Sequence, residues 1–351
     1  MVRRRFFHAV AVALLATGFG GVAYAQVPKS PKSDAALDQK TVRLLRRMVE
    51  AERKVPYIAR ESTLRADGPG AENIVKFDPK QGLRREPTGG KGRVVLDTPR
   101  RSYRFSLNKP GNVDTDESRF TKLDKRVKEL VMRLGKHLLS AQVVGVDTVA
   151  GRTCDIVEVR ATRIPDAPTR RFWIDRETGL RLRTEEKNAQ GKVLSGSYYT
   201  SLDLNPKFVA TDFAPPTVAE RNGDAGRGNR GPRLGKRDRY PTVAEARQAG
   251  LTVPEPSHLP SGYMLRQIEA TKNGSHVALR YANGLNALSL TVLRDGVPER
   301  VKPFLSPDGS AYLPFPQGKH GLFVRGENGG AYLLIGDLPE GELRKIAASV
   351  K

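Results

Sequence analysis

Cysteine is nearly absent from this sequence, because Cys154 is the single one in 351 residues. An intramolecular disulfide is therefore impossible, and a metal cluster held by several thiolates is excluded. We expect Cys154 to be a small core residue beneath a sheet, and an intermolecular disulfide or a nucleophile are the alternatives. Hydrophobic residues make up 38% of the chain and aromatic residues 7%, which is enough for a core but on the lean side.

Histidine is also scarce, and the common catalytic motifs are missing. The five histidines are His8, His137, His258, His276 and His320. None of them stands in H-E-x-x-H or in another metal-ligand spacing. The serine nucleophile motif G-x-S-x-G is absent, and "TGGKGR" at 88–93 lacks the frame of a phosphate-binding loop, so we interpret it as a hairpin turn. We therefore expect no metal and no cofactor.

Paired carboxylates are the remaining candidates for catalysis. Asp175 and Glu177 flank a turn that ends at Gly179, where acidic residues favour the turn geometry itself. Glu185 and Glu186 are neighbours on a predicted strand and point to opposite faces, so they cannot share a proton. Acid–base hydrolysis needs two carboxyls that converge on one cleft. The sequence shows no such pair, and we expect the protein to have no catalytic residues and not to be an enzyme.

Acidic residues are the minority, since 38 Asp and Glu stand against 60 Lys and Arg and the net charge is +22. Such an excess favours anionic partners: nucleic acid, anionic lipid headgroups or an acidic protein. The cellular compartment decides among these partners.

The N-terminus has the pattern of a cleaved secretory signal peptide. Basic Arg3–Arg5 precede an apolar run over Phe6–Val22, and the A-x-A motif follows at Ala23–Ala25. We predict cleavage after Ala25, by the Sec or the twin-arginine route, and a periplasmic or extracytoplasmic location. Export leaves an anionic envelope surface as a partner, and we expect no nucleic acid.

Periodicity predicts one helix followed by strands in the first third of the chain. Apolar residues keep helical spacing over Leu37–Val55, and the outer face of this helix is basic. Short β-rich segments separated by turns follow at 57–64, 73–78, 92–97 and 102–107. Their connections are too short for helical crossovers, so they predict an antiparallel meander.

The strongest amphipathic pattern of the chain lies at 118–141, "SRFTKLDKRVKELVMRLGKHLLSA", with cap candidates over Asp114–Ser118. We interpret it as a second helix packed over a sheet, and a membrane-surface helix is the alternative. Strands resume at 143–149 and continue with near-regular turns over 151–204, which predicts a twisted sheet.

Composition changes at 215–240, where Gly, Arg and Pro dominate. The run "GRGNRGPR" is similar to RNA-binding tails, but 223–239 contains no aromatic residue for base stacking, so we interpret the segment as a flexible basic linker. The predicted organisation is a signal peptide at 1–25, a flexible leader at 26–36, a first domain at 37–214, the linker at 215–240 and a small α+β domain at 241–351.

The run "GRTCDIVEVR…RRFWIDRETGLRLRTEE…GKVLSGSYYTSLDL", together with the predicted helices and meander, resembles the LolA-like lipoprotein-carrier superfamily. Within this superfamily, the segment "LLRRMVEAERKVPYIARESTL" resembles the N-terminal domain of the MucB/RseB envelope-stress regulators. The resemblance covers 37–213, and its most specific marker is the turn with Asp175, Glu177, Thr178 and Gly179.

The C-terminal unit resembles a small domain of unsettled role that occurs on exported sensors and on proteins tied to anti-sigma factors. The matching residues are Pro256, Leu259, Pro260, Gly262, Tyr263, Leu279 and Tyr281. This unit is shorter than the second domain that MucB/RseB proteins usually carry.

The resemblance implies an α+β protein: a curved antiparallel half-barrel sheet lidded by helices, with a second smaller α+β domain. It also implies that the apolar inner face of the half-barrel at 37–214 binds an acyl chain, a lipoprotein or an apolar peptide. The candidate residues of this cavity wall are Val157, Val159, Phe172, Ile174, Leu182 and Tyr198.

The function implied by the resemblance is that of an exported, non-enzymatic sensor that binds a lipid or lipoprotein. It would regulate a sigma factor by binding the extracytoplasmic domain of a membrane-bound anti-sigma factor. The alternative is a LolA-like periplasmic lipoprotein carrier. An envelope hydrolase is less favoured, because the catalytic motifs are missing, and adhesion to anionic envelope polymer is a fourth possibility.

Overall fold

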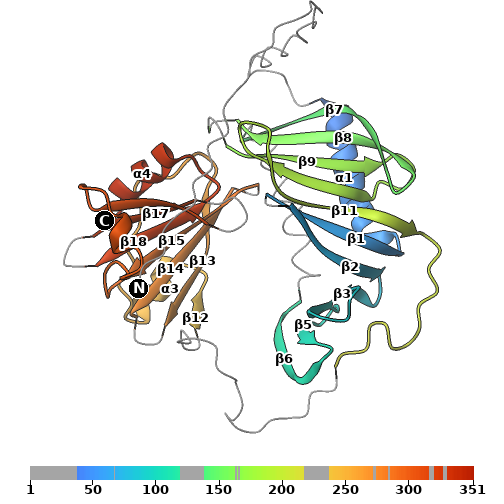
Figure 1. Ribbon diagram of the computed structural model, residues 1–351, viewed down its shortest axis with the longest axis horizontal. Helices are drawn as coiled ribbons and strands as arrows, with labels where there is room; N and C mark the ends of the chain where they lie inside the picture. Colours follow the sequence, from blue (N-terminus) through green and yellow to red (C-terminus); the bar gives the residue numbers. More distant parts are fainter. Residues whose placement is uncertain are drawn as a thin grey trace, which may run out of the picture. The chain divides into compact units, whose positions relative to one another are not determined.

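The computed structural model describes residues 38–66, 68–118, 138–162, 164, 167–216, 237–271, 274–283, 285–315, 320–326 and 330–351. They form an eleven-stranded sheet, a smaller seven-stranded sheet and few helices (Figure 1). All strand pairs are antiparallel, and the first sheet is curved and open. The predicted α+β fold with two sheet domains is confirmed.

The first sheet consists of two meanders joined side by side. The first meander is β1 (Tyr57–Arg65), β2 (Gly68–Asp78), β3 (Gly82–Pro87), β4 (Arg93–Asp97), β5 (Arg101–Ser106) and β6 (Lys109–Glu117). The second is β7 (Leu139–Val149), β8 (Arg152–Ala161), β9 (Thr169–Asp175), β10 (Arg181–Lys187) and β11 (Val193–Asp203). The strand order β6-β5-β4-β3-β2-β1-β11-β10-β9-β8-β7 joins them through β1 and β11 and leaves β6 and β7 as edges.

Helix α1 (Gln39–Lys54) lies across one face of this sheet (Figure 1). Asp38 caps its N-terminus by accepting a hydrogen bond of 3.0 Å from the amide of Lys40. Leu45, Met48 and Val49 form its buried stripe, and burial of each contributes about 1.5–3 kcal/mol. The basic outer face predicted for this helix is exposed to solvent.

The structure corrects two predictions around the second amphipathic pattern. Asp114–Glu117 lie in strand β6 and do not cap a helix. Leu139–Ala141, predicted as the end of that helix, begin strand β7. The helix prediction for 119–137 lies outside the described residues. Apolar spacing misled at this end, because Leu139 and Ala141 form the buried face at the start of an edge strand, and such a face carries apolar residues as a helix stripe does.

The second sheet contains seven strands, and its first strand lies at the end of the segment predicted as linker. The strands are β12 (Arg237–Tyr240), β13 (Met264–Thr271), β14 (His276–Ala282), β15 (Ala287–Leu293), β16 (Ser310–Pro314), β17 (His320–Arg325) and β18 (Ala331–Gly336), in the order β12-β13-β14-β15-β18-β17-β16. Helices α3 (Val243–Gln248) and α4 (Glu340–Ala348) accompany them, with a short 3₁₀ turn at Lys302–Phe304. Leu343 and Ile346 of α4 are fully buried.

Cys154 of β8 is completely buried and is a free thiol. Burial raises its pKa to about 12, so the thiol stays protonated at neutral pH and is a poor nucleophile. The prediction of a small core residue is confirmed. Among the residues that the structure describes, no helix combines the length and the apolar character that a membrane span requires.

The turn between β9 and β10 is built around the carboxylate of Asp175, which is 1% exposed. It accepts hydrogen bonds from Arg152 Nη2 (2.9 Å), the Thr178 amide (2.9 Å) and Thr178 Oγ1 (2.5 Å). Burial acts to raise the pKa of Asp175, but the bonds from Arg152 and Thr178 outweigh it and hold the pKa below its usual value. Gly179 closes the turn at φ +81°, where a Cβ would meet the Arg47 side chain at 2.8 Å.

We expect Asp175→Asn to lower the free energy of unfolding by about 2–3 kcal/mol at pH 7, because it weakens hydrogen bonds to a buried charge. A depressed carboxyl pKa contributes stability above the pKa of the unfolded state, and this is lost as pH falls through the folded-state pKa. The difference between wild type and variant therefore narrows below about pH 4. Urea unfolding at pH 7 and pH 3 measures both effects.

Glu177→Gln is the matched control for this variant. Glu177 also binds Arg152, at 2.7 Å, but its side chain is 81% exposed. An exposed pair contributes about 0–1 kcal/mol, so this change should be nearly neutral. Equal losses in the two variants would show that the buried carboxylate does not stabilise the turn.

Candidate ligand-binding pocket

Strand pairing gathers charged residues on one face of the first sheet. Glu61 of β1 is paired with Tyr199 of β11 on one side and with Asn73 of β2 on the other. Arg85 of β3 is paired with Val75 of β2, which is two residues from Asn73 and so on the same face. Residues from both meanders therefore meet over the β1–β11 seam.

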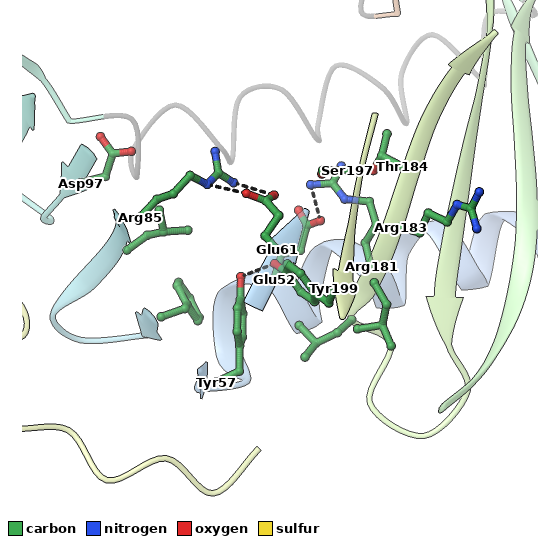
Figure 2. A pocket seen from close by; sticks show the side chains of 14 residues that line it. Glu52, Tyr57, Glu61, Arg85, Asp97, Arg181, Arg183, Thr184, Ser197 and Tyr199 are labelled. Atoms are coloured by element: carbon green, nitrogen blue, oxygen red, sulfur yellow. Dashed lines mark hydrogen bonds and ion pairs between the residues drawn. The ribbon is translucent and has the colours of Figure 1, made fainter. Parts of the chain in front are cut away.

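A pocket of about 220 Å³ opens at this place (Figure 2). Six charged, four hydroxyl-bearing and four apolar side chains line it. They are Glu52, Glu61, Arg85, Asp97, Arg181 and Arg183; Tyr57, Thr184, Ser197 and Tyr199; and Phe77, Leu83, Leu180 and Leu182. The lining is mixed, whereas the resemblance implies an apolar wall.

Arg85 and Glu61 form a two-point ion pair at the centre of the pocket (Figure 2). Arg85 Nε lies 2.9 Å from Glu61 Oε2, and Arg85 Nη2 donates to Glu61 Oε1 at 3.1 Å. Glu61 is 4% exposed, and Asn73 Nδ2 donates to it at 3.4 Å. A buried carboxylate requires such partners, because desolvation otherwise strongly disfavours its charge.

Arg181 extends the charged lining toward α1. Its guanidinium lies 2.9 Å from Glu52 Oε1 and also stacks on the Phe172 ring, 5.7 Å from the centroid. Helix α1 therefore has two roles: Glu52 lines the pocket, and the apolar stripe of the helix packs in the core.

Two tyrosines meet across the seam. The Tyr57 and Tyr199 hydroxyls are 3.0 Å apart and share a hydrogen bond, and their rings lie 5.7 Å apart. Burial raises the pKa of Tyr199 to about 12 and raises that of Tyr57 well above its ordinary value. Both hydroxyls are therefore protonated at neutral pH; one donates its hydrogen to the other, which leaves the second O–H as a further donor.

Asp97 differs from Glu52 and Glu61 because none of the described residues forms an ion pair with it. It is 8% exposed, and its Oδ1 is buried with no hydrogen-bond partner. Ser102, its cross-strand partner, is 1% exposed, and its hydroxyl oxygen is also buried without a partner.

The structure does not gather the six predicted wall residues around one cavity. Leu182 lines the pocket. Four others are buried in the cluster that includes the α1 stripe: Val157, Val159, Phe172 and Ile174. Tyr198 is paired with Arg183, and Phe172 with Thr184, so Tyr198 and Phe172 lie on opposite sheet faces.

Sequence reasoning missed the charged residues of the pocket. Glu61 alternates with Tyr57 and Ala59 along β1, and a charge at such an inward position was the available signal. The partners Arg85, on β3, and Arg181, on β10, could not be found, because their proximity depends on pairing between distant strands.

Comparisons with known proteins agree with this architecture. Residues 92–217 match the family model of the MucB/RseB N-terminal domain. No match was found among curated proteins.

Solved structures of MucB complexes are similar over both sheets. The Pseudomonas aeruginosa MucA/MucB complex shares 17% identity, covers 89% of this chain and 98% of that chain, and has a TM-score of 0.58. A crystal structure of MucB in complex with MucA(peri) shares 18% identity with the same two coverages and a TM-score of 0.55. A LolA superfamily protein from Nitrosomonas europaea matches at 10% identity over 50% of this chain and 97% of that chain, with a TM-score of 0.24.

The fold and the pocket define a class of protein: a curved open sheet with a helix on one face and a mixed pocket, joined in sequence to a second sheet domain. Within this class, the chain has a MucB-like fold, and residues 92–217 match the MucB/RseB N-terminal domain. At these identities the similarity establishes the fold.

We expect Arg85→Met to lower the free energy of unfolding by about 2–3 kcal/mol, because it leaves Glu61 buried without its main partner. The double variant Arg85→Met/Glu61→Gln should recover most of this loss, since no buried charge remains. Chemical unfolding of both variants and of Glu61→Gln completes a double-mutant cycle.

Arg93→Met provides the control for Arg85→Met. Arg93 lies 3.5 Å from Asp114, whose side chain is 65% exposed, so its loss should cost less than about 1 kcal/mol. If the double variant is no more stable than Arg85→Met, a stranded charge is not the cause.

Proposed function

We propose that this chain is an exported, periplasmic, non-enzymatic regulator that binds the extracytoplasmic domain of an anti-sigma factor. The observation that carries the proposal is the similarity to MucB in complex with MucA, which extends over 98% of the MucB chain. The similarity therefore includes the second sheet as well as the pocket-bearing sheet. Its predicted signal peptide and the match of 92–217 to the MucB/RseB domain also support the proposal.

The pocket on the first sheet supplies a place for the signal. We propose that a lipid or lipoprotein group enters it and changes the affinity for the anti-sigma factor. Such coupling requires that the ligand bind the free protein and the complex with different affinities. The pocket lies over the seam between the two meanders, where a ligand contacts strands of both.

A LolA-like carrier of lipoproteins is the second candidate, favoured by the resemblance of the sequence over 37–213 to the LolA-like lipoprotein-carrier superfamily. A carrier must release lipoproteins from membranes, whereas a regulator need only bind their lipid groups. Incubation of the purified chain with lipoprotein-loaded vesicles separates the two, because only a carrier moves lipoprotein into the soluble fraction.

The regulator proposal predicts a direct complex with the anti-sigma factor encoded in the same genome. The chain without its predicted signal peptide, mixed with the purified extracytoplasmic domain, should elute as one complex in size-exclusion chromatography. Calorimetry should give a micromolar or tighter dissociation constant, about 8 kcal/mol or more of binding free energy. The cytoplasmic domain of the same anti-sigma factor is the control, and absence of a complex with the extracytoplasmic domain refutes the regulator role.

The basic face of α1 predicts association with an anionic envelope surface. Lys40, Arg43 and Arg46 are exposed there, and each basic residue near an anionic membrane contributes about 1 kcal/mol. The triple change to Glu should therefore weaken sedimentation with phosphatidylglycerol vesicles by at least a hundredfold at low salt. Phosphatidylcholine vesicles are the control, and unchanged binding of the variant would exclude this face.

A further inference from the structure

The unpartnered carboxylate of Asp97 points to a specific ligand class. Asp97 ends β4, lines the pocket and is more than nine-tenths buried, with Oδ1 unbonded. Ser102 on the neighbouring strand adds a second buried oxygen without a partner. Burial of an unpaired carboxylate is strongly unfavourable, so its presence in a pocket indicates a group supplied from outside.

The other charges of the pocket are balanced by neighbours. The ion pairs are Arg85 with Glu61, Arg181 with Glu52, and Arg183 with Glu185. Asp97 therefore carries the one negative charge of the lining for which the described residues provide no counter-ion. The ligand group that fits beside it is a cation.

The surroundings of Asp97 favour an organic cation over a metal ion. The described residues contain no group of three or more His, Cys, Asp or Glu that could hold a metal. Phe77, Leu83 and the Tyr57 ring provide apolar surface in the same pocket. The volume of this pocket is about 220 Å³. Pockets for drug-sized ligands begin at roughly 300 Å³, so this pocket has room for only one group of a larger molecule.

We propose that Asp97 and Ser102 bind an ammonium group carried on an apolar body. Asp97 forms the ion pair, Ser102 accepts a second N–H hydrogen bond, and the apolar side chains contact the attached hydrocarbon. The proposal rests on the proposed function in one respect, namely that this pocket is where the chain takes its ligand.

Calorimetry of the chain without its signal peptide, at pH 7 and low salt, tests this with n-octylammonium, n-octanol and n-octanoate. Octylammonium should bind at least about tenfold tighter than octanol, as expected for a hydrogen bond to a charged group. Octanoate should bind most weakly. The full sequence has a net charge of +22, and the chain without its signal peptide remains strongly basic and attracts anions, so a preference for the ammonium cannot come from the overall field of the protein.

Asp97→Asn should abolish the preference for octylammonium over octanol, and Ser102→Ala should reduce it about threefold. Asp97→Asn removes a buried charge, and Ser102→Ala removes a buried oxygen that has no partner. Both variants should therefore remain folded, which circular dichroism checks. Asp114→Asn is the control: it removes an exposed carboxylate from the same sheet and should leave the preference unchanged.

The outcomes separate this inference from the proposed function. Equal binding of octanol and octylammonium by the wild type overturns the ammonium site and leaves apolar-ligand binding in place. Preference for octylammonium that persists in Asp97→Asn also overturns it. Absence of binding by all three probes overturns both the ammonium site and the ligand-sensing part of the proposed function.

Discussion

The pairing of β1 with β11 is the constraint on which the first sheet depends. It joins two meanders into one sheet, and Tyr57 and Tyr199, which share a hydrogen bond across it, are 142 residues apart. Bringing such distant strands together carries a loop-closure entropy cost, which the ladder and the side chains over it must offset. The pocket lies over this seam, so a ligand that binds there stabilises the junction by mass action.

The polar interior of the seam has an energetic consequence. Glu61 and Glu185 are each almost fully buried and held by arginines. Replacing such pairs by apolar residues is often neutral or stabilising, so the pairs are weak evidence for stability. What the Arg85–Glu61 pair provides here is geometry, because its guanidinium fixes the position of a carboxylate that lines the pocket. An apolar lining would admit many hydrocarbon groups, whereas this lining distinguishes ligands by charge.

The sequence predicts local structure well and the site poorly. Periodicity located α1, and the turn residues around Asp175 located the β9–β10 hairpin, because both depend on neighbours in the chain. The seam between β1 and β11 depends on contacts over more than a hundred residues, and no periodicity encodes it. The alternation of apolar and polar residues along a strand separates its two faces, but it does not show which of these residues line a cavity. Phe172 and Tyr198 were therefore predicted to line one wall, although the register puts them on opposite faces.

Two kinds of electrostatics operate on different length scales in this protein. The excess of 60 basic over 38 acidic residues creates a field that favours anionic surfaces, and salt screens it over about 8–10 Å. The carboxylate of Asp97 is buried, where water and ions screen far less, so it attracts a cation in contact with it strongly and added salt hardly weakens this attraction. Selection of a cation by the pocket is therefore compatible with the strongly basic character of the whole protein. Added salt weakens attachment to an anionic surface or partner while leaving the choice of ligand in the pocket nearly unchanged.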